Sequence, residues 1–285
     1  MGVNKSMILM HGGFRVNSKI RQQIARRKRE VARRLDKNDN RGCDRPIMTA
    51  ANIHYEIAER AQATSAGGIA AMHLMVRKLG LADAIDRHLG LLKIHLPYHD
   101  SDHVLNIAYN LLAGGRCLEH LELLRTNVAY LDALGARRVP DPTTAGDFCR
   151  RFDDCGIYKL QQVFNATRLK VWRQQPKAFF AEAILDADGT MVETTGNCKQ
   201  GMEINYKGQW GYHPLVVSLA NTGEPLYVVN RPGNRPSHEE AAWYFDQSIE
   251  LCRKAGFGKI LLRGDTDFTQ SDRLDGWDQD GVRFI

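Results

Sequence analysis

Apolar residues along this chain recur with two different periods, and the change falls near residue 176. Before that point they return every three or four positions, a spacing that places them on one face of a helix. After it, short apolar runs end at turn-forming residues, as strands do. The pattern predicts a helical region followed by a mixed α/β region.

Glycines divide the helical region, because glycine favours the left-handed conformation found just past a helix C-terminus. A glycine follows each of four predicted helices, which cover residues 69–79, 81–89, 101–113 and 117–134. Another helix begins at Thr143 or Thr144. A longer amphipathic helix over residues 157–174 ends before Pro176.

The α/β region opens with four strand-like runs, at residues 179–186, 191–195, 215–220 and 226–229. A helix over residues 237–255 follows, with Ser237 and Glu240 spaced as a capping box. The last predicted elements are a strand, a short helix and a second strand, at residues 259–263, 270–278 and 282–285. Antiparallel strands followed by a βαβ crossover predict a mixed sheet with helices packed on it.

Positive charge is concentrated near the N-terminus. The formal net charge is +6, but residues 1–45 alone carry thirteen Lys and Arg against four Asp and Glu. Residues 17–37 have the pattern of a basic amphipathic helix that would hold DNA phosphates through Arg26, Arg27, Lys28 and Arg29. The alternative is a solvated helix, disordered when alone, or a translated leader ahead of Met48.

Composition restricts the compartment. No apolar run approaches the roughly 18 to 20 residues that cross a membrane, and the apolar patch at Met7–Met10 is too short for a signal peptide. The six cysteines are scattered without a CxxC pair, which favours reduced thiols. We therefore expect a cytoplasmic protein with no membrane partner.

Two strands of the α/β region end in aspartate. Asp186 and Asp188 lie two apart at the end of the first strand and so share a face. Asp265 and Asp267 follow the apolar run at residues 260–262. In an RNase H-like layout these two strands are neighbours, so we expect the acids to converge. Carboxylates suit Mg²⁺, and two such ions about 3.5 to 4 Å apart support in-line phosphoryl displacement.

Three histidines, His95, His99 and His103, lie four residues apart but are not expected to bind metal. Pro97 interrupts any helix that carries His95, and Ser101 has the character of a helix N-cap. A structural loop is the better interpretation.

Four arginines have either a DNA-binding or a structural interpretation. Arg150 and Arg151 contact DNA phosphates or pair with the aspartates that follow them at positions 153 and 154. Arg231 and Arg235 hold a phosphate beside the acids, or they are solvated in a loop rich in Pro and Gly.

An aromatic segment between two predicted strands has the same two interpretations. Trp210, Tyr212 and His213 stack on a flipped or frayed base, or they belong to the core, where aromatic residues flanking strands more often lie. Lys199 and Lys207, in the same polar stretch, would then line the path of the DNA.

Several longer segments together resemble the transposases of bacterial insertion sequences of family 1380, a branch of the DDE superfamily. The segments read GGIAAMHLMVRKLGLADAIDRHL, LPYHDSDHVLNIAYNLLAGGRCLEHLELLR, DPTTAGDFCRRF, ILDADGTMVETTG, GYHPLVVSLANTGEPLYVVNRPGN and LLRGDTDF. The resemblance runs from about Ala66 to residue 285. It implies an RNase H-like catalytic domain, binding of double-stranded DNA at terminal inverted repeats and target, a homodimer on that DNA, and strand cleavage and joining that depend on Mg²⁺, for which Mn²⁺ can substitute.

The resemblance also gives the predicted regions their roles. Residues 1–65 form the basic arm and a linker, residues 66–175 an all-helical DNA-binding domain, and residues 176–285 an RNase H-like catalytic domain. The second catalytic acid falls on Asp265. The first falls on Asp188, which is followed by Gly and a hydroxyl residue, although Asp186 shares its face and stays possible; Asp267 is interpreted as a loop residue.

The family's third acid, a glutamate on a later helix, is missing from the pattern. Glu239, Glu240 and Glu250 precede Asp265 and so stand in the wrong order. We therefore expect a catalytic domain that is incomplete at its C-terminus, and a truncated chain that is defective alone. The alternatives are a non-catalytic DNA-binding remnant or regulator of transposition, and an RNase H-like nuclease without end specificity.

Overall fold

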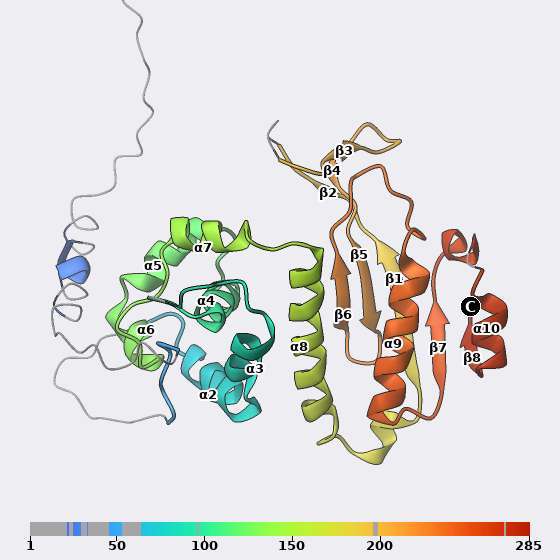
Figure 1. Ribbon diagram of the computed structural model, residues 1–285, viewed down its shortest axis with the longest axis horizontal. Helices are drawn as coiled ribbons and strands as arrows, with labels where there is room; N and C mark the ends of the chain where they lie inside the picture. Colours follow the sequence, from blue (N-terminus) through green and yellow to red (C-terminus); the bar gives the residue numbers. More distant parts are fainter. Residues whose placement is uncertain are drawn as a thin grey trace, which may run out of the picture. The chain divides into compact units, whose positions relative to one another are not determined.

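The computed structural model describes residues 22, 25–29, 33, 46–52, 64–95, 97–195, 199–270 and 272–285 (Figure 1). The chain divides into two compact units, residues 1–153 and 154–285. Most of the predicted basic helix lies outside the described residues. Its described positions, which include Arg26, Arg27, Lys28 and Arg29, are helical and exposed.

In the first unit, the described residues form short helices around one apolar core. They are α2 (Ile69–Leu79), α3 (Leu81–His88), α4 (Asp100–Leu112), η1 (Leu118–His120), α5 (Leu121–Arg125), α6 (Val128–Ala133) and α7 (Pro142–Cys149). The core gathers Leu105, Tyr109, Tyr130 and Leu131, and Met48 inserts into it from the segment that follows the arm.

The single helix expected over residues 117–134 is wrong. The chain forms η1, α5 and α6 there, and Asn127 starts the last of them, because its side chain accepts the Tyr130 N–H at 3.1 Å. An asparagine that caps a helix is favoured over one inside it.

A five-stranded mixed sheet organises the second unit (Figure 1). Its order is β6 (Glu224–Val229), β5 (Leu215–Leu219), β1 (Ala183–Gly189), β7 (Ile260–Arg263) and β8 (Val282–Phe284). The central strand β1 runs antiparallel to β5 and parallel to β7, while β7 and β8 are also parallel. The mixed sheet expected from the order of the elements is therefore present.

One face of this sheet is covered by α9 (Ala241–Ala255). Alternate residues of β1, including Leu185, are buried against it, and Phe245, Ile249 and Cys252 supply the helix side of the core. A short helix, α10 (Leu274–Gln279), links β7 to β8 and adds Trp277. Period-2 burial along β1 leaves its other side chains on the opposite face.

The long helix α8 (Asp154–Trp172) belongs with the sheet. Trp172 lies in the sheet core, the Tyr158 hydroxyl donates to Gln247 of α9 at 2.9 Å, and Arg168 pairs with Glu224 of β6 at 2.9 Å. The sequence pattern grouped this helix with the preceding ones, because periodicity identifies a helix but not the surface that its apolar side contacts.

Two element boundaries differ from expectation. Phe179 and Phe180 form a 3₁₀ turn, η2 (Lys177–Phe180), rather than the start of a strand, and their rings pack against Phe257. The predicted capping box of Ser237 is also wrong, since α9 begins at Ala241 after Glu240, whose φ is +63° and whose side chain makes no cap.

A second, small sheet is formed by residues between β1 and β5. Its order is β2 (Val192–Glu193), β4 (Trp210–Tyr212) and β3 (Glu203–Ile204), all antiparallel. Figure 1 shows it extending past the end of the main sheet at which β1 finishes. Strands of two or three residues are too short to produce a period, so only the first of them was anticipated, as residues 191–195.

Candidate active site at the sheet edge

The strands β1 and β7 bring two aspartates to the same edge of the sheet. They are parallel neighbours, and Asp186 stands opposite Arg263. Arg263 is the last residue of β7, so the pairing ends there, and Asp265 follows two residues later at the start of a turn. Asp188 and Asp265 thus both follow the paired part of two adjacent parallel strands, at the same end of the sheet.

The two aspartates of β1 have different surroundings. Asp186 is held in a bidentate ion pair by Arg263, with the Nε–Oδ1 and Nη2–Oδ2 distances both 2.7 Å. This hydrogen-bonded pairing raises the pKa of Arg263. Asp188 is exposed, and no partner for its carboxylate is found in the part of the chain that the structure describes. Asp188 is therefore the carboxylate that is free to bind a cation.

Asp265 is fixed by the turn that it starts. Its Oδ1 accepts the Asp267 N–H at 3.0 Å, at the beginning of η3 (Thr266–Gln270), and its carbonyl accepts the Phe268 N–H. Gly264 lets Phe268 fold back, because a Cβ at that position would lie 2.8 Å from the ring. One oxygen of Asp265 thus orients the carboxylate, and the residue as a whole is exposed. Asp267 contributes its N–H to this turn, as expected of a loop residue.

The donors at this edge are carboxylates, the ligand type that hard divalent cations prefer. Among the described residues, no three or more His, Cys, Asp or Glu side chains form a group that could hold a metal ion. Asp188 and Asp265 are nevertheless a pair of hard oxygen donors at an exposed edge. Mg²⁺ is commonly bound by one or two carboxylates, with waters and substrate phosphates in its other positions.

A comparison with protein families identifies the family of the chain. Residues 52–285 match the model described as transposase DDE domain group 1. The chain belongs to this family. No curated protein and no solved structure matches the chain. The chain is thus a DDE transposase domain, and its mixed sheet with flanking helices is consistent with an RNase H-like fold.

Behind the acids of the DDE domain, a buried arginine holds the surrounding loops. Arg231 is only 4% exposed. It donates from Nε to the His213 carbonyl at 3.1 Å and from Nη1 to the Glu239 carbonyl at 2.6 Å. Burial lowers its pKa. Arg235, by contrast, lies at the surface and pairs with Glu239 at 2.9 Å. A contact of either arginine with phosphate stays a prediction.

His213 packs directly against the end of β1. A Cβ added to Gly189, the residue after Asp188, would collide with the His213 ring. The Nδ1 atom of His213 and the Nη2 atom of Arg231 are buried, and neither has a hydrogen-bond partner among the described residues. Glycine at position 189 is therefore needed for this close approach.

The arginines predicted to bind DNA in the first unit are exposed. Arg150 pairs with Asp147 at 2.6 Å, one turn back on α7. Arg151 is exposed at the end of the same helix, and Lys28 lies 3.7 Å from Glu122. Nothing in these contacts tests DNA binding, which stays a prediction.

The three spaced histidines have structural contacts. The His95 and His99 rings stack with centroids 5.0 Å apart, and His103 stacks on Phe148 at 4.4 Å. Burial lowers the pKa of His103 to about 4, so this imidazole is neutral at physiological pH. These contacts suit the structural loop that the sequence indicated.

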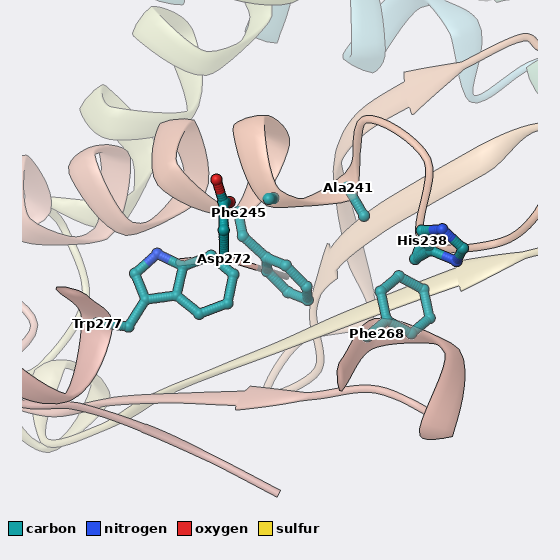
Figure 2. Close-up of a pocket in the computed structure, with 7 residues that line it drawn as sticks. His238, Ala241, Phe245, Phe268, Asp272 and Trp277 are labelled. Atoms are coloured by element: carbon teal, nitrogen blue, oxygen red, sulfur yellow. The ribbon is translucent and has the colours of Figure 1, made fainter. Parts of the chain in front are cut away.

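A small pocket lies on the α9 side of the DDE domain. Figure 2 shows that it is lined mainly by aromatic rings, and its lining residues are His238, Ala241, Ala242, Phe245, Phe268, Asp272 and Trp277. Neither Asp188 nor Asp265 lines it. Its connection to the site is structural, because Phe268 belongs to the turn that Asp265 starts.

Arg263 is the one residue of the site that the sequence did not single out. It stands two positions before Asp265 in the segment RGDTDF. The sequence feature that could have identified it is a positively charged residue two positions before a candidate acid. Its partner, however, lies 77 residues earlier, and only the register of β1 and β7 identifies it.

Within the described ranges, every helix is too short or too polar to span a bilayer.

Proposed function

We propose that this chain is the transposase of a bacterial insertion sequence of family 1380. It binds the terminal inverted repeats of its element as a homodimer, and it cuts and joins DNA strands with Mg²⁺, or with Mn²⁺ in its place. The observation that supports the proposal is the exposed carboxylate of Asp188, which has no partner among the described residues, at the end of a strand that runs parallel to the strand preceding Asp265.

In this proposal the residues at the sheet edge have different roles. Asp188 and Asp265 would hold the metal, and Asp186 would stay paired with Arg263 and fix the end of β1. Bound there, Mg²⁺ supplies charge neutralisation for the phosphate and for the attacking oxygen. In the cleavage step a water oxygen forms a new bond to phosphorus as the bond to the 3′ oxygen breaks. In the joining step the released 3′-hydroxyl loses its proton and its oxygen bonds to a target phosphorus, while the bond from that phosphorus to the target strand's own 3′ oxygen breaks and that oxygen leaves as a new 3′-hydroxyl.

We assign two carboxylates, those of Asp188 and Asp265, to the metal, whereas the resemblance implies three. Metal and phosphate would therefore be held incompletely. We expect the purified chain to bind metal and DNA ends, to cleave weakly and to join no strands. Strand transfer by the purified 285-residue chain would contradict this expectation.

Metal binding tests the site without requiring catalysis. We expect Tb³⁺ luminescence, or the electron paramagnetic resonance of Mn²⁺, to report binding to the wild type. Asp188→Asn and Asp265→Asn should each weaken it by about tenfold or more, since each removes one of few charged ligands. Asp186→Asn is the matched control, and it should change affinity by less than about threefold. Equal losses from Asp186→Asn and Asp188→Asn would contradict the assignment of the first acid.

DNA binding separates the proposal from its alternatives. The probe is duplex DNA carrying the sequences that flank the gene, compared with a scrambled duplex. Preference for the flanking ends with metal-dependent nicking supports a transposase. Preference for the ends without nicking in Mg²⁺ or Mn²⁺ favours a DNA-binding remnant or regulator. Nicking without preference favours a nuclease unconnected to transposition.

A further inference from the structure

One face of the small sheet formed by β2, β3 and β4 is apolar and exposed. In register, Val192 pairs with Tyr212, and Ile204 pairs with Trp210. Residues directly opposite each other share a face, as do residues two apart on one strand, so all four side chains lie together. Val192 is 46% exposed, Ile204 54% and Trp210 39%.

The opposite face of the small sheet is acidic. Glu193 and Glu203 both pair with Gly211, and both are exposed. The loop after β6 packs on the centre of the sheet, since a Cβ on Gly233 would collide with the carbonyls of Glu203 and Gly211. The two faces therefore differ in character, and the negative charge of the strands is confined to one of them.

The turn between β3 and β4 presents an aromatic ring and a cation. Tyr206 is 92% exposed, and the Lys207 Nζ lies 5.3 Å from the centroid of its ring. The turn is closed by Asn205, whose Oδ1 accepts the N–H groups of Lys207 and Gln209, each at 2.9 Å. An almost fully exposed tyrosine on a well-bonded turn is thus held out toward a partner.

The small sheet is anchored beside the acids. Tyr212 bridges Pro232, and Arg231 fixes the carbonyl of His213 between β4 and β5. Val192 lies four residues beyond Asp188, so the apolar face begins at most about 14 Å from that residue, from about 3.5 Å of reach per residue. That limit holds for Val192; Trp210 lies on the neighbouring strand β4, and Tyr206 on the turn between β3 and β4.

We propose that the apolar face of the small sheet, together with Tyr206, binds unpaired bases of the DNA strand whose phosphate is held at Asp188 and Asp265. This inference rests on the proposed function, because it places the DNA strand at that edge. Aromatic rings interleaved with lysine bind single-stranded DNA, since every base offers a face for stacking. The acidic opposite face repels the phosphate backbone, which leaves the apolar face for the bases.

Frayed DNA ends are the probe for this site. The wild type is compared on a duplex whose last four base pairs are mismatched and on a fully paired duplex of the same length. Tyr206→Ala and Trp210→Ala should each reduce the preference for the frayed end by about fivefold or more. Tyr206→Phe should keep it, because the phenyl ring still stacks. Glu203→Gln, on the acidic face, is the matched control and should not reduce it.

Photocrosslinking locates the contact independently. With 5-iodouracil at positions one to four of the frayed strand, we expect crosslinks in the peptide that contains Tyr206 and Trp210, and none from position twelve. Crosslinks confined to other peptides would overturn the inference, as would undiminished fraying preference in both alanine variants. A change in oligomeric state of Trp210→Ala with unchanged DNA binding would assign the face to a second copy of the chain.

The failure of the inference is distinguishable from failure of the proposed function. Tb³⁺ binding at Asp188 and Asp265 should be unchanged in Tyr206→Ala and Trp210→Ala. If metal binding is present but the fraying preference is absent, the apolar face has another role and the active-site assignment stands. If metal binding is absent from the wild type, the proposed function itself fails.

Discussion

The two units of the chain both contain clustered aspartates, and the clusters have opposite surroundings. In the helical unit, Asp100 and Asp102 are fully buried at the start of α4. Asp100 accepts the Leu91 N–H at 3.0 Å, and Asp102 accepts the His99 N–H at 2.9 Å. At the sheet edge, Asp188 is exposed and makes no such bonds within the described residues.

This difference separates structural from functional carboxylates. A buried carboxylate is tolerated only where hydrogen bonds replace its hydration, so the acids of α4 are committed to holding loops. Asp102 also accepts the Ile47 N–H, 55 residues away, and so fixes the segment that follows the basic arm. A solvated carboxylate at a strand end, in contrast, keeps its oxygens for a ligand.

The largest loss of stability should follow the replacement of a buried aspartate of α4. Asp102→Ala leaves the His99 and Ile47 N–H groups without their acceptor, and the free energy of unfolding should fall by about 2 to 4 kcal/mol in urea titrations. Asp83→Ala, at an exposed position of the same unit, is the control and should cost less than about 1 kcal/mol. Equal losses in the two variants would show that the buried hydrogen bonds of Asp102 do not stabilise the fold.

The pH dependence of stability should also reflect the burial of Asp102. Burial raises the pKa of Asp102 to about 6. The folded state therefore holds a proton that the unfolded chain releases from about pH 4, and the stabilising contribution is lost as pH rises through 6. The stability of the wild type relative to Asp102→Asn should fall by up to about 3 kcal/mol between pH 4 and pH 6.5.

The comparison with Asp102→Asn is needed because two histidines act in the opposite sense. Burial lowers the pKa values of His73 and His103 to about 4, so their contribution is lost as pH falls below 6.5. Both variants share this contribution, and it cancels in the difference. A difference curve that is flat between pH 4 and pH 6.5 would show that Asp102 is not the titrating group.

Loss of the half-exposed ion pair at the sheet edge should have an intermediate effect on the free energy of unfolding. Arg263→Gln removes the partner of Asp186, and it should lower the free energy of unfolding by no more than about 1 kcal/mol, since both side chains are partly solvated. The loss should shrink further in 0.5 M salt. A cost of several kcal/mol would mean that the pair is buried in solution.

The smallest effect on stability should come from the exposed acid. Asp188→Asn should change the free energy of unfolding by less than about 0.5 kcal/mol, because no hydrogen bond is lost. The same variant should lose metal binding. Strong destabilisation by Asp188→Asn would show that this carboxylate supports the fold rather than a ligand.

Most of the fold follows from local patterns. The change of period near residue 176 separates helices from strands, and the apolar runs at β1, β5, β6 and β7 each become a strand. The features that local patterns fail to predict are determined by contacts between residues distant in sequence. Asn127 divides a helix by capping it, and the rings of Phe179 and Phe180 turn inward to Phe257 rather than extend β1.

The candidate site shows the same division. Acids at strand ends were visible in the sequence, but the pattern could not choose between Asp186 and Asp188, because both share a face. The choice becomes possible through Arg263, which occupies the first and leaves the second free. The small sheet was missed because its residues alternate over too few positions. The predicted arm lies outside the described residues for most of its length.

The parallel pairing of β1 with β7 has a consequence for biosynthesis. The residues that meet across it are separated by 77 positions, with β5, β6 and α9 in between. Contacts this distant form late in folding, because closing a long stretch of chain costs entropy before it is rewarded. A nascent polypeptide still on the ribosome would therefore not yet have Asp186 beside Arg263. The edge that carries Asp188 and Asp265 would form only after synthesis had passed β7 and the sheet had closed.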